Sequence, residues 1–157
     1  MSTTISTNIA KQFRDSYFGG NWTFVNLQDQ LADLTWQEAT TKISGLNSIA
    51  ALVFHIGYYN RILIPVLEGG ALVGKDSESW ETPVIENEEA WRSLVEGVFA
   101  DVDKMAILLE QYPDEKLWDV FHDGNYGNNY RNFTGIIEHL NYHLGQISFI
   151  KKLIRKG

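Results

Sequence analysis

The sequence predicts an all-α protein, a four-helix bundle, and three observations support that prediction. Apolar residues recur at three- and four-residue steps over four long stretches. Glycine, asparagine and proline separate these stretches, and no segment of useful length alternates apolar and polar residues as a half-buried strand does. With 157 residues and a hydrophobic content of 44%, the chain fits a single domain over residues 1–157.

The first helical region is predicted from about residue 4 to about residue 34. Its first part has an apolar residue at every fourth position: Ile5, Ile9, Phe13 and Tyr17. Gly19-Gly20 interrupts this pattern, and a second apolar series follows at Phe24, Leu27, Leu31 and Leu34. We therefore expect a break at the glycines and helix on both sides of it.

The second helix is expected from a cap at Asn47 or Ser48 through about Leu67. Pro65 should kink or shorten its last turns, and Gly69-Gly70 should end it. Residues 69–86 are predicted to be a loop because glycine, aspartate, serine and proline are frequent there.

The third helix should start after Asn87, which is a good capping residue, and end near Tyr112-Pro113. The turn-rich segment 123–129 is not expected to be helical. The fourth helix is predicted from about residue 132 to residue 156. The basic residues near its end suit the negative end of a helix dipole.

The connection between the second and third helices is roughly eighteen residues long, much longer than a tight antiparallel turn needs. A long crossover there allows these two helices to run parallel, with the fourth helix antiparallel to both. Bundles of this kind assemble metal sites from side chains on facing helices.

Composition excludes several classes of function. The chain has no cysteine, which rules out disulfides, thiolate metal ligands and a cysteine nucleophile. A net charge of −7 and a pI near 5.0 disfavour binding to nucleic acid. No uninterrupted apolar run approaches eighteen residues, and residues 1–5 lack the features of a signal peptide. We therefore expect a cytoplasmic protein that does not associate with membranes.

The most informative local pattern is His139-Leu140-Asn141-Tyr142-His143. Two histidines four residues apart lie on one face of a helix, where both rings can reach one divalent cation. At 100° per residue, Gln146, Gly135 and Asn132 fall on the same stripe. A core stripe would normally be aliphatic, so this polar one needs partners. Histidines also occur in helices for packing and hydrogen bonding alone, and that alternative stays open.

Two ligands rarely hold a metal, and His55 is the candidate for a third because it lies inside another apolar helical segment. Gln146 is a candidate to orient bound water or to hold an imidazole by a hydrogen bond. Tyr59 and Asn60 follow His55 and are weaker candidates for lining a pocket. His122 is predicted to be a solvated loop residue.

Several segments resemble the DinB/YfiT-like superfamily. The stretch Ile137–Ile147, with His-x-x-x-His followed by Gly-Gln-Ile, is similar to the last-helix motif of that family, and Ser48–Ile56 is similar to its second helix, which has one histidine. Gly20-Asn21-Trp22, residues 34–39 and Trp80-Glu81-Thr82-Pro83 also match patterns seen in its members. The resemblance thus covers most of the chain.

This resemblance implies an up-down-down-up four-helix bundle, usually dimeric, in which His55, His139 and His143 bind a divalent ion such as zinc or nickel. Relatives with known activities include metal-dependent hydrolases, and transferases or isomerases that use low-molecular-weight thiols. The expected partners are therefore a small-molecule substrate, a low-molecular-weight thiol as co-substrate in the case of a thiol transferase, and a second copy of the chain.

Three neutral imidazoles leave a divalent cation with at least one open position, which suits either thiol transfer or hydrolysis. The sequence does not choose between these reactions. Any attacking sulfur must come from a diffusible thiol, because the chain has no cysteine. The alternative from a different class is a non-catalytic dimeric bundle with a structural or vestigial metal site.

Overall fold

The computed structural model describes residues 4–156, so residues 1–3 of the amino-terminal stretch and residue 157 lie outside it. Every regular element in that range is an α-helix or a 3-10 helix, which confirms the all-α class. The one β feature there is an isolated bridge between Val120 and Asn128. The elements are α1 (Ile5–Phe18), α2 (Leu27–Leu31), α3 (Trp36–Thr40), α4 (Ile49–Leu67), η1 (Asp76–Trp80), α5 (Glu88–Glu110), η2 (Asp114–Trp118) and α6 (Asn129–Lys156).

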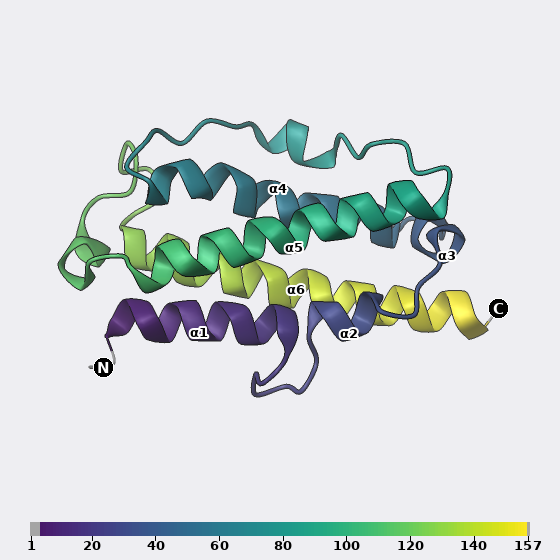
Figure 1. The fold of residues 1–157 in the computed structure, drawn as a ribbon. Coiled ribbons are helices and arrows are strands. Elements are labelled where there is room, and N and C mark those ends of the chain that lie inside the picture. Colours follow the sequence, from purple (N-terminus) through teal and green to yellow (C-terminus); the bar gives the residue numbers. More distant parts are fainter. Residues whose placement is uncertain (1–3, 157) are drawn as a thin grey trace.

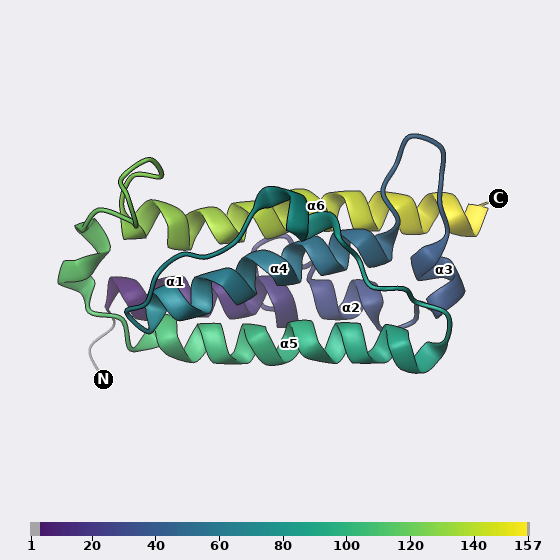
Figure 2. The ribbon, with the colours of Figure 1, turned by 90° about the horizontal axis from the view of Figure 1, so that it is seen from above.

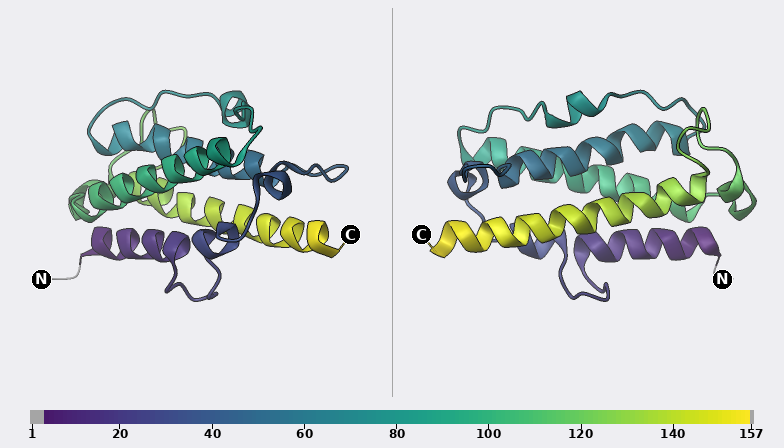
Figure 3. Two further views of the ribbon diagram at one scale, coloured as in Figure 1. Left: turned by 45° about the vertical axis from the view of Figure 1, so that its right-hand side comes forward. Right: turned by 180° about the vertical axis from the view of Figure 1, so that it is seen from behind.

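The four long helices α1, α4, α5 and α6 lie alongside one another, and short α2 follows α1 along α6 (Figure 1). The colour gradient shows α4 and α5 running in one direction and α1 and α6 in the other. The start of α1 and the end of α6 lie at opposite ends of the molecule (Figure 3). Seen from above, the connection from α4 to α5 passes over α4 beside α6, with η1 near its middle (Figure 2).

The break predicted at Gly19-Gly20 is present, but the region after it is only partly helical. The backbone of Gly19 has a φ of +108°, a conformation that favours glycine, and α1 ends there. Helix is present at Leu27–Leu31, but the prediction that it includes Phe24 and extends to Leu34 is wrong. Phe24 has a φ of +54° and is 89% exposed in a loop, and α2 begins only after Asn26, whose side chain accepts from the Asp29 amide.

Helix α3 was not predicted, because five residues are too few to show an apolar period. Its start is fixed by a capping box, in which Thr35 and Glu38 each accept a hydrogen bond from the other's backbone amide. Ala39, a residue of this helix, is fully buried. The short helix closes the connection from α2 to α4.

Helix α4 begins with Ser48 as its cap, since the Ser48 hydroxyl accepts from the Ala51 amide. Pro65 lies inside its last turn and does not shorten it, because the helix continues to Leu67. The Gly70 amide then donates to the Pro65 carbonyl at 2.8 Å, and Gly69 has a φ of +87°. The glycines therefore end the helix, as predicted.

Helices α5 and α6 agree with the prediction except at one boundary. Asn87 caps α5 by accepting from the Ala90 amide. α6 begins at Asn129 instead of about residue 132, because the Asn128 side chain accepts from the Arg131 amide and caps the helix earlier. The η1 and η2 turns, each five residues long, were not predicted.

The core lies between the long helices, and the contact of α4 with α5 is its most extensive part. Gly57 of α4 is buried there against Val98 of α5. Among residues 4–156, α4 is the one helix whose length and apolar composition would suffice to cross a membrane. Most of it is buried inside the protein, which is the pattern of a core helix.

Candidate metal centre

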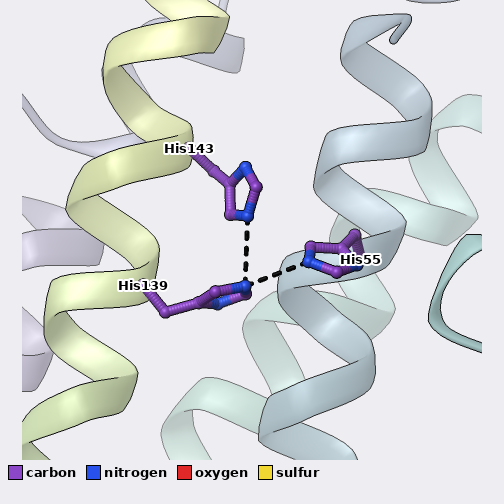
Figure 4. Close-up of side chains that lie close together, drawn as sticks. All are labelled: His55, His139 and His143. Atoms are coloured by element: carbon purple, nitrogen blue, oxygen red, sulfur yellow. Dashed lines mark hydrogen bonds between the residues drawn. The ribbon is translucent and has the colours of Figure 1, made fainter. Parts of the chain in front are cut away.

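His55 of α4 and the pair His139 and His143 of α6 come together in space. The Nε2 atom of His139 lies 3.0 Å from Nε2 of His55 and 3.1 Å from Nε2 of His143 (Figure 4). One ligand atom from each ring lies within 4.8 Å of the others, so these three residues can hold a metal ion. Nitrogen ligands about 2.0–2.1 Å from zinc stand about 3.3 Å apart in a tetrahedral site, close to the two separations at His139 Nε2.

The helices explain why these rings converge. His139 and His143 are one turn apart on α6, and α4 packs beside α6 at the level of His55. His55 and His143 are 4% and 6% exposed, whereas His139 is half-buried. The site is therefore enclosed on two sides and most accessible at His139.

Residues of η1 fix the orientation of the His55 ring. Ser79 Oγ is 2.9 Å from His55 Nδ1, and the same hydroxyl donates to the Asp76 carbonyl at 2.6 Å. Because the serine proton is committed to that carbonyl, Ser79 Oγ accepts from the Nδ1–H of His55. The lone pair of His55 then resides on Nε2, which faces the other two rings.

Gln146 has the same relation to His143. Its Oε1 atom lies 2.7 Å from His143 Nδ1, three residues earlier on α6. A carbonyl oxygen only accepts, so His143 Nδ1 bears the proton and Nε2 bears the lone pair. Gln146, which the sequence places on the same helix face as the two histidines, thus contacts the His143 ring nitrogen that faces away from the cluster.

The hydrogen bonding of His139 is incomplete. Its Nε2 atom faces two lone pairs, of His55 and His143, and a neutral ring has one proton to offer them. If that proton is on Nε2, His139 Nδ1 is left as a bare acceptor, and Nδ1 is buried without a hydrogen-bond partner. A cation among the three Nε2 atoms would be shared by all three lone pairs. The residues present therefore fit a divalent metal ion.

Aromatic rings enclose the histidines. The Trp80 ring stacks on His55, with centroids 3.8 Å apart and an interplanar angle of 18°. Tyr59 meets His55 and His139 edge-on, at 5.1 and 4.8 Å, and its hydroxyl donates to Asp76 at 2.6 Å. Burial, followed by that hydrogen bond to a carboxylate, raises the pKa of Tyr59 to about 12. Tyr59 therefore stays protonated and ties α4 to η1.

The three imidazoles are neutral at pH 7. Burial, and then repulsion from His143, lowers the pKa of His55 to about 4. Burial, and then repulsion from His143 and His55, lowers the pKa of His139 to about 4. Burial also lowers the pKa of His143, although the hydrogen bond that His143 Nδ1 donates to Gln146 Oε1 acts in the opposite direction. Neutral rings are ready to bind metal without first losing a proton.

These pKa values predict that metal-free protein loses stability as the pH falls from about 6.5 to about 4. In that window the unfolded chain takes up protons at its histidines while the folded protein does not, so protonation favours unfolding. Above pH 6.5 both states are neutral and the effect vanishes. Urea unfolding in the presence of a chelator at pH 7, 6 and 5 measures it, above the range where carboxylates titrate. A midpoint that stays constant across these values would contradict the prediction, and His139→Gln should reduce the slope.

The other candidates fall outside the cluster. Asn60 is buried, but its side chain donates to the Tyr17 hydroxyl at 2.7 Å, which is a packing role. His122 is exposed in a loop with a φ of +51°, as expected for a solvated residue.

Ser79 and Trp80 were missed as site residues. Both lie in the segment predicted to be a loop. Ser79 is 24 residues after His55, and no spacing rule links a loop serine to a helical histidine. The one signal was the Trp80-Glu81-Thr82-Pro83 motif, which was noted as a family pattern without a role.

Comparison with known proteins decides the family. The sequence pattern of the DinB superfamily matches residues 19–146, which is more than half of the chain. The chain belongs to the DinB superfamily. Comparison with curated proteins and with solved structures gave no match. In this DinB superfamily protein the matched range contains all three clustered histidines and Gln146, so the family pattern and the geometry concern the same residues.

Proposed function

We propose that this protein is a metal-dependent enzyme acting on small molecules, with His55, His139 and His143 as the ligands of a divalent ion. The observation that supports the proposal most is the meeting of three Nε2 lone pairs, two of them fixed by hydrogen bonds on the far side of the ring. Such outer hydrogen bonds are the usual companions of histidine ligands. A site held only for packing would not need two such bonds that point the Nε2 acceptors of His55 and His143 toward His139 Nε2.

The proposed reaction is thiol transfer to an electrophile, or hydrolysis. When bound, a divalent ion supplies Lewis acidity that makes a thiol or water nucleophilic near neutral pH. The chain itself orients the ligand rings through Ser79 and Gln146 and excludes water with Trp80 and Tyr59. A thiol used by this site has to be a diffusible co-substrate, since the sequence has no cysteine.

Zinc or nickel is the proposed metal, since neutral imidazole suits both ions. The proposal also includes an up-down-down-up four-helix bundle as a single domain, assembled as a homodimer. A cytoplasmic location would keep a thiol co-substrate reduced. A net charge of −7 supports a small-molecule partner over nucleic acid, and the burial of α4 supports a protein without a membrane partner.

The test begins with the metal content of protein purified without an affinity tag. We expect about one equivalent of zinc or nickel per chain after loading and dialysis. Loaded protein is then incubated with a panel of low-molecular-weight thiols and an electrophile such as 1-chloro-2,4-dinitrobenzene, and thiol loss is followed. One equivalent of metal without consumption of any thiol or hydrolysis of model esters and amides would favour a non-catalytic bundle with a structural metal site.

Ser79→Ala is expected to weaken zinc binding by about 10- to 100-fold, because His55 loses the acceptor that fixes its tautomer and ring orientation. Isothermal titration with zinc measures the change. Ser77→Ala is the matched control: it makes the same substitution in η1 at a residue that is exposed, and it should bind zinc as the wild type does. Equal affinities for Ser79→Ala and the wild type would remove the orienting role.

A further inference from the structure

A pocket of about 490 Å³ lies directly beside the histidine cluster and has no role in the chemistry described so far. It is formed by α4, α6, the connection between α4 and α5, and the loop before α6. Its walls are mainly apolar and aromatic, and they include Tyr58, Ile62, Leu72, Phe121 and Ile136. A space of this size with such walls is typical of small-molecule sites.

The pocket reaches the histidine cluster at one point. His139, the most accessible of the three imidazoles, lines the pocket, whereas His55 and His143 do not. Tyr59, whose ring edge packs on His139, also lines it. A molecule in the pocket would therefore approach the three Nε2 atoms past His139.

Gly135 lines this pocket and leaves space where a larger residue would place a side chain. It lies on α6 one turn before His139, and both residues line the pocket. A Cβ atom built on Gly135 would meet no atom within 4 Å outside its own helix. Glycine inside a helix costs about 1 kcal/mol relative to alanine, and packing does not require one here. The absence of a side chain at Gly135 therefore enlarges the pocket.

The charged residues that line the pocket do not favour an ionic ligand. Lys75 and Asp76 both line the pocket and have opposite signs, and the Asp76 carboxylate already accepts from Tyr59. The remaining lining is mostly apolar, so burying a charged body there would be costly. The molecule that fits this pocket has an uncharged, apolar body and a metal-binding atom that can reach the histidine cluster.

We propose that this pocket binds the apolar body of the substrate, that the preferred substrate has a ring-sized hydrophobic group, and that Gly135 sets the size limit. This inference rests on the proposed metal-dependent function, since it places the reacting end of the substrate beside His139. Gly135 acts as a specificity-determining residue, because a larger side chain there would occupy the space of the hydrophobic group.

The first experiment compares benzohydroxamate with acetohydroxamate, which share a metal-binding head and differ in a phenyl or methyl body. Calorimetric titration of zinc-loaded wild type should give an affinity for benzohydroxamate about tenfold or more higher, from burial of the ring. Gly135→Leu should remove this preference while binding zinc and acetohydroxamate normally. Gly145→Leu is the matched control: it makes the same change in α6, also at a glycine with open space around its Cβ position, and should keep the preference.

Equal affinities of the wild type for benzohydroxamate and acetohydroxamate would overturn the proposal, and so would a preference for benzohydroxamate that survives in Gly135→Leu. Neither result would contradict the metal-dependent function. Circular dichroism checks the folding of each variant. If Gly135→Leu is poorly folded, Gly135→Met, with a more flexible side chain, replaces it in the same comparison.

A second experiment needs no metal. Phenol at millimolar concentration should shift the amide resonances of Asn132 and Ile136 in metal-free wild type and Gly145→Leu, and should leave them unchanged in Gly135→Leu. If zinc does not bind but phenol produces these shifts, the metal-dependent function fails and the apolar pocket is supported. If phenol produces no shift in the wild type, the pocket proposal is overturned.

Discussion

His139→Ala is expected to abolish stoichiometric metal binding while leaving the protein folded. Three-histidine coordination would lose the ring that faces both partners. Structural zinc sites gain about 10–16 kcal/mol in total, so one of four ligand positions corresponds to roughly 3 kcal/mol, or about 100-fold in affinity. Dialysed protein at micromolar concentration should then retain less than about a tenth of an equivalent, measured by elemental analysis.

The metal-free protein should respond differently to the same substitution. The lost contacts of His139 are offset by removal of a buried Nδ1 atom that has no partner. We therefore expect its free energy of unfolding to change by no more than about 1 kcal/mol. The control is His122→Asn, which removes the remaining histidine at a loop position whose positive φ asparagine tolerates. Loss of metal in His122→Asn as well as in His139→Ala would indicate adventitious binding and contradict the proposed site.

Gly57→Leu is expected to destabilise the protein by about 3 kcal/mol or more, because it overpacks the contact between α4 and α5. A Cβ atom on Gly57 would lie 2.6 Å from Cγ2 of Val98, which is buried and cannot move into solvent. The gain in helix propensity, about 1 kcal/mol for replacing a helical glycine, is smaller than this cost. Urea unfolding gives the difference in the free energy of unfolding.

Gly97→Leu is the matched control for this effect. Gly97 precedes Val98 in α5, is exposed, and has no atom within 4 Å of its Cβ position. The same substitution there should be neutral or should stabilise the protein by up to about 1 kcal/mol. Val98→Ala removes the clashing methyl groups, so it should cost less in the Gly57→Leu background than alone. Equal effects at positions 57 and 97 would show that close helix packing is not the reason for the glycine.

The long helices were predictable because each has an apolar stripe and a capping side chain near its start. Ser48 and Asn87 mark two of those starts in the sequence and in the structure. The short helices escaped prediction because their stability comes from local capping and tertiary contact, as at Thr35 and Glu38. Phe24 was misassigned because an apolar residue at the right spacing looks helical even when it is exposed in a loop.

The histidine cluster was only partly predictable for a related reason. The spacing of His139 and His143, and the place of Gln146 on their stripe, follow from helix geometry alone. The pairing of His55 with them depends on how α4 packs on α6, which periodicity does not specify. Ser79 depends further on the path of an irregular connection over α4. Local geometry was therefore predictable, whereas contacts between distant segments needed the structure.

The sequence separation within the cluster makes it a probe of tertiary order. His139 and His143 are four residues apart and stay neighbours in any state that keeps α6, whereas His55 is 84 residues from His139. In a molten globule with intact helices and loose packing, the protein would offer only a bidentate pair. Metal affinity would then drop when the helices slide apart, before circular dichroism records any loss of helix.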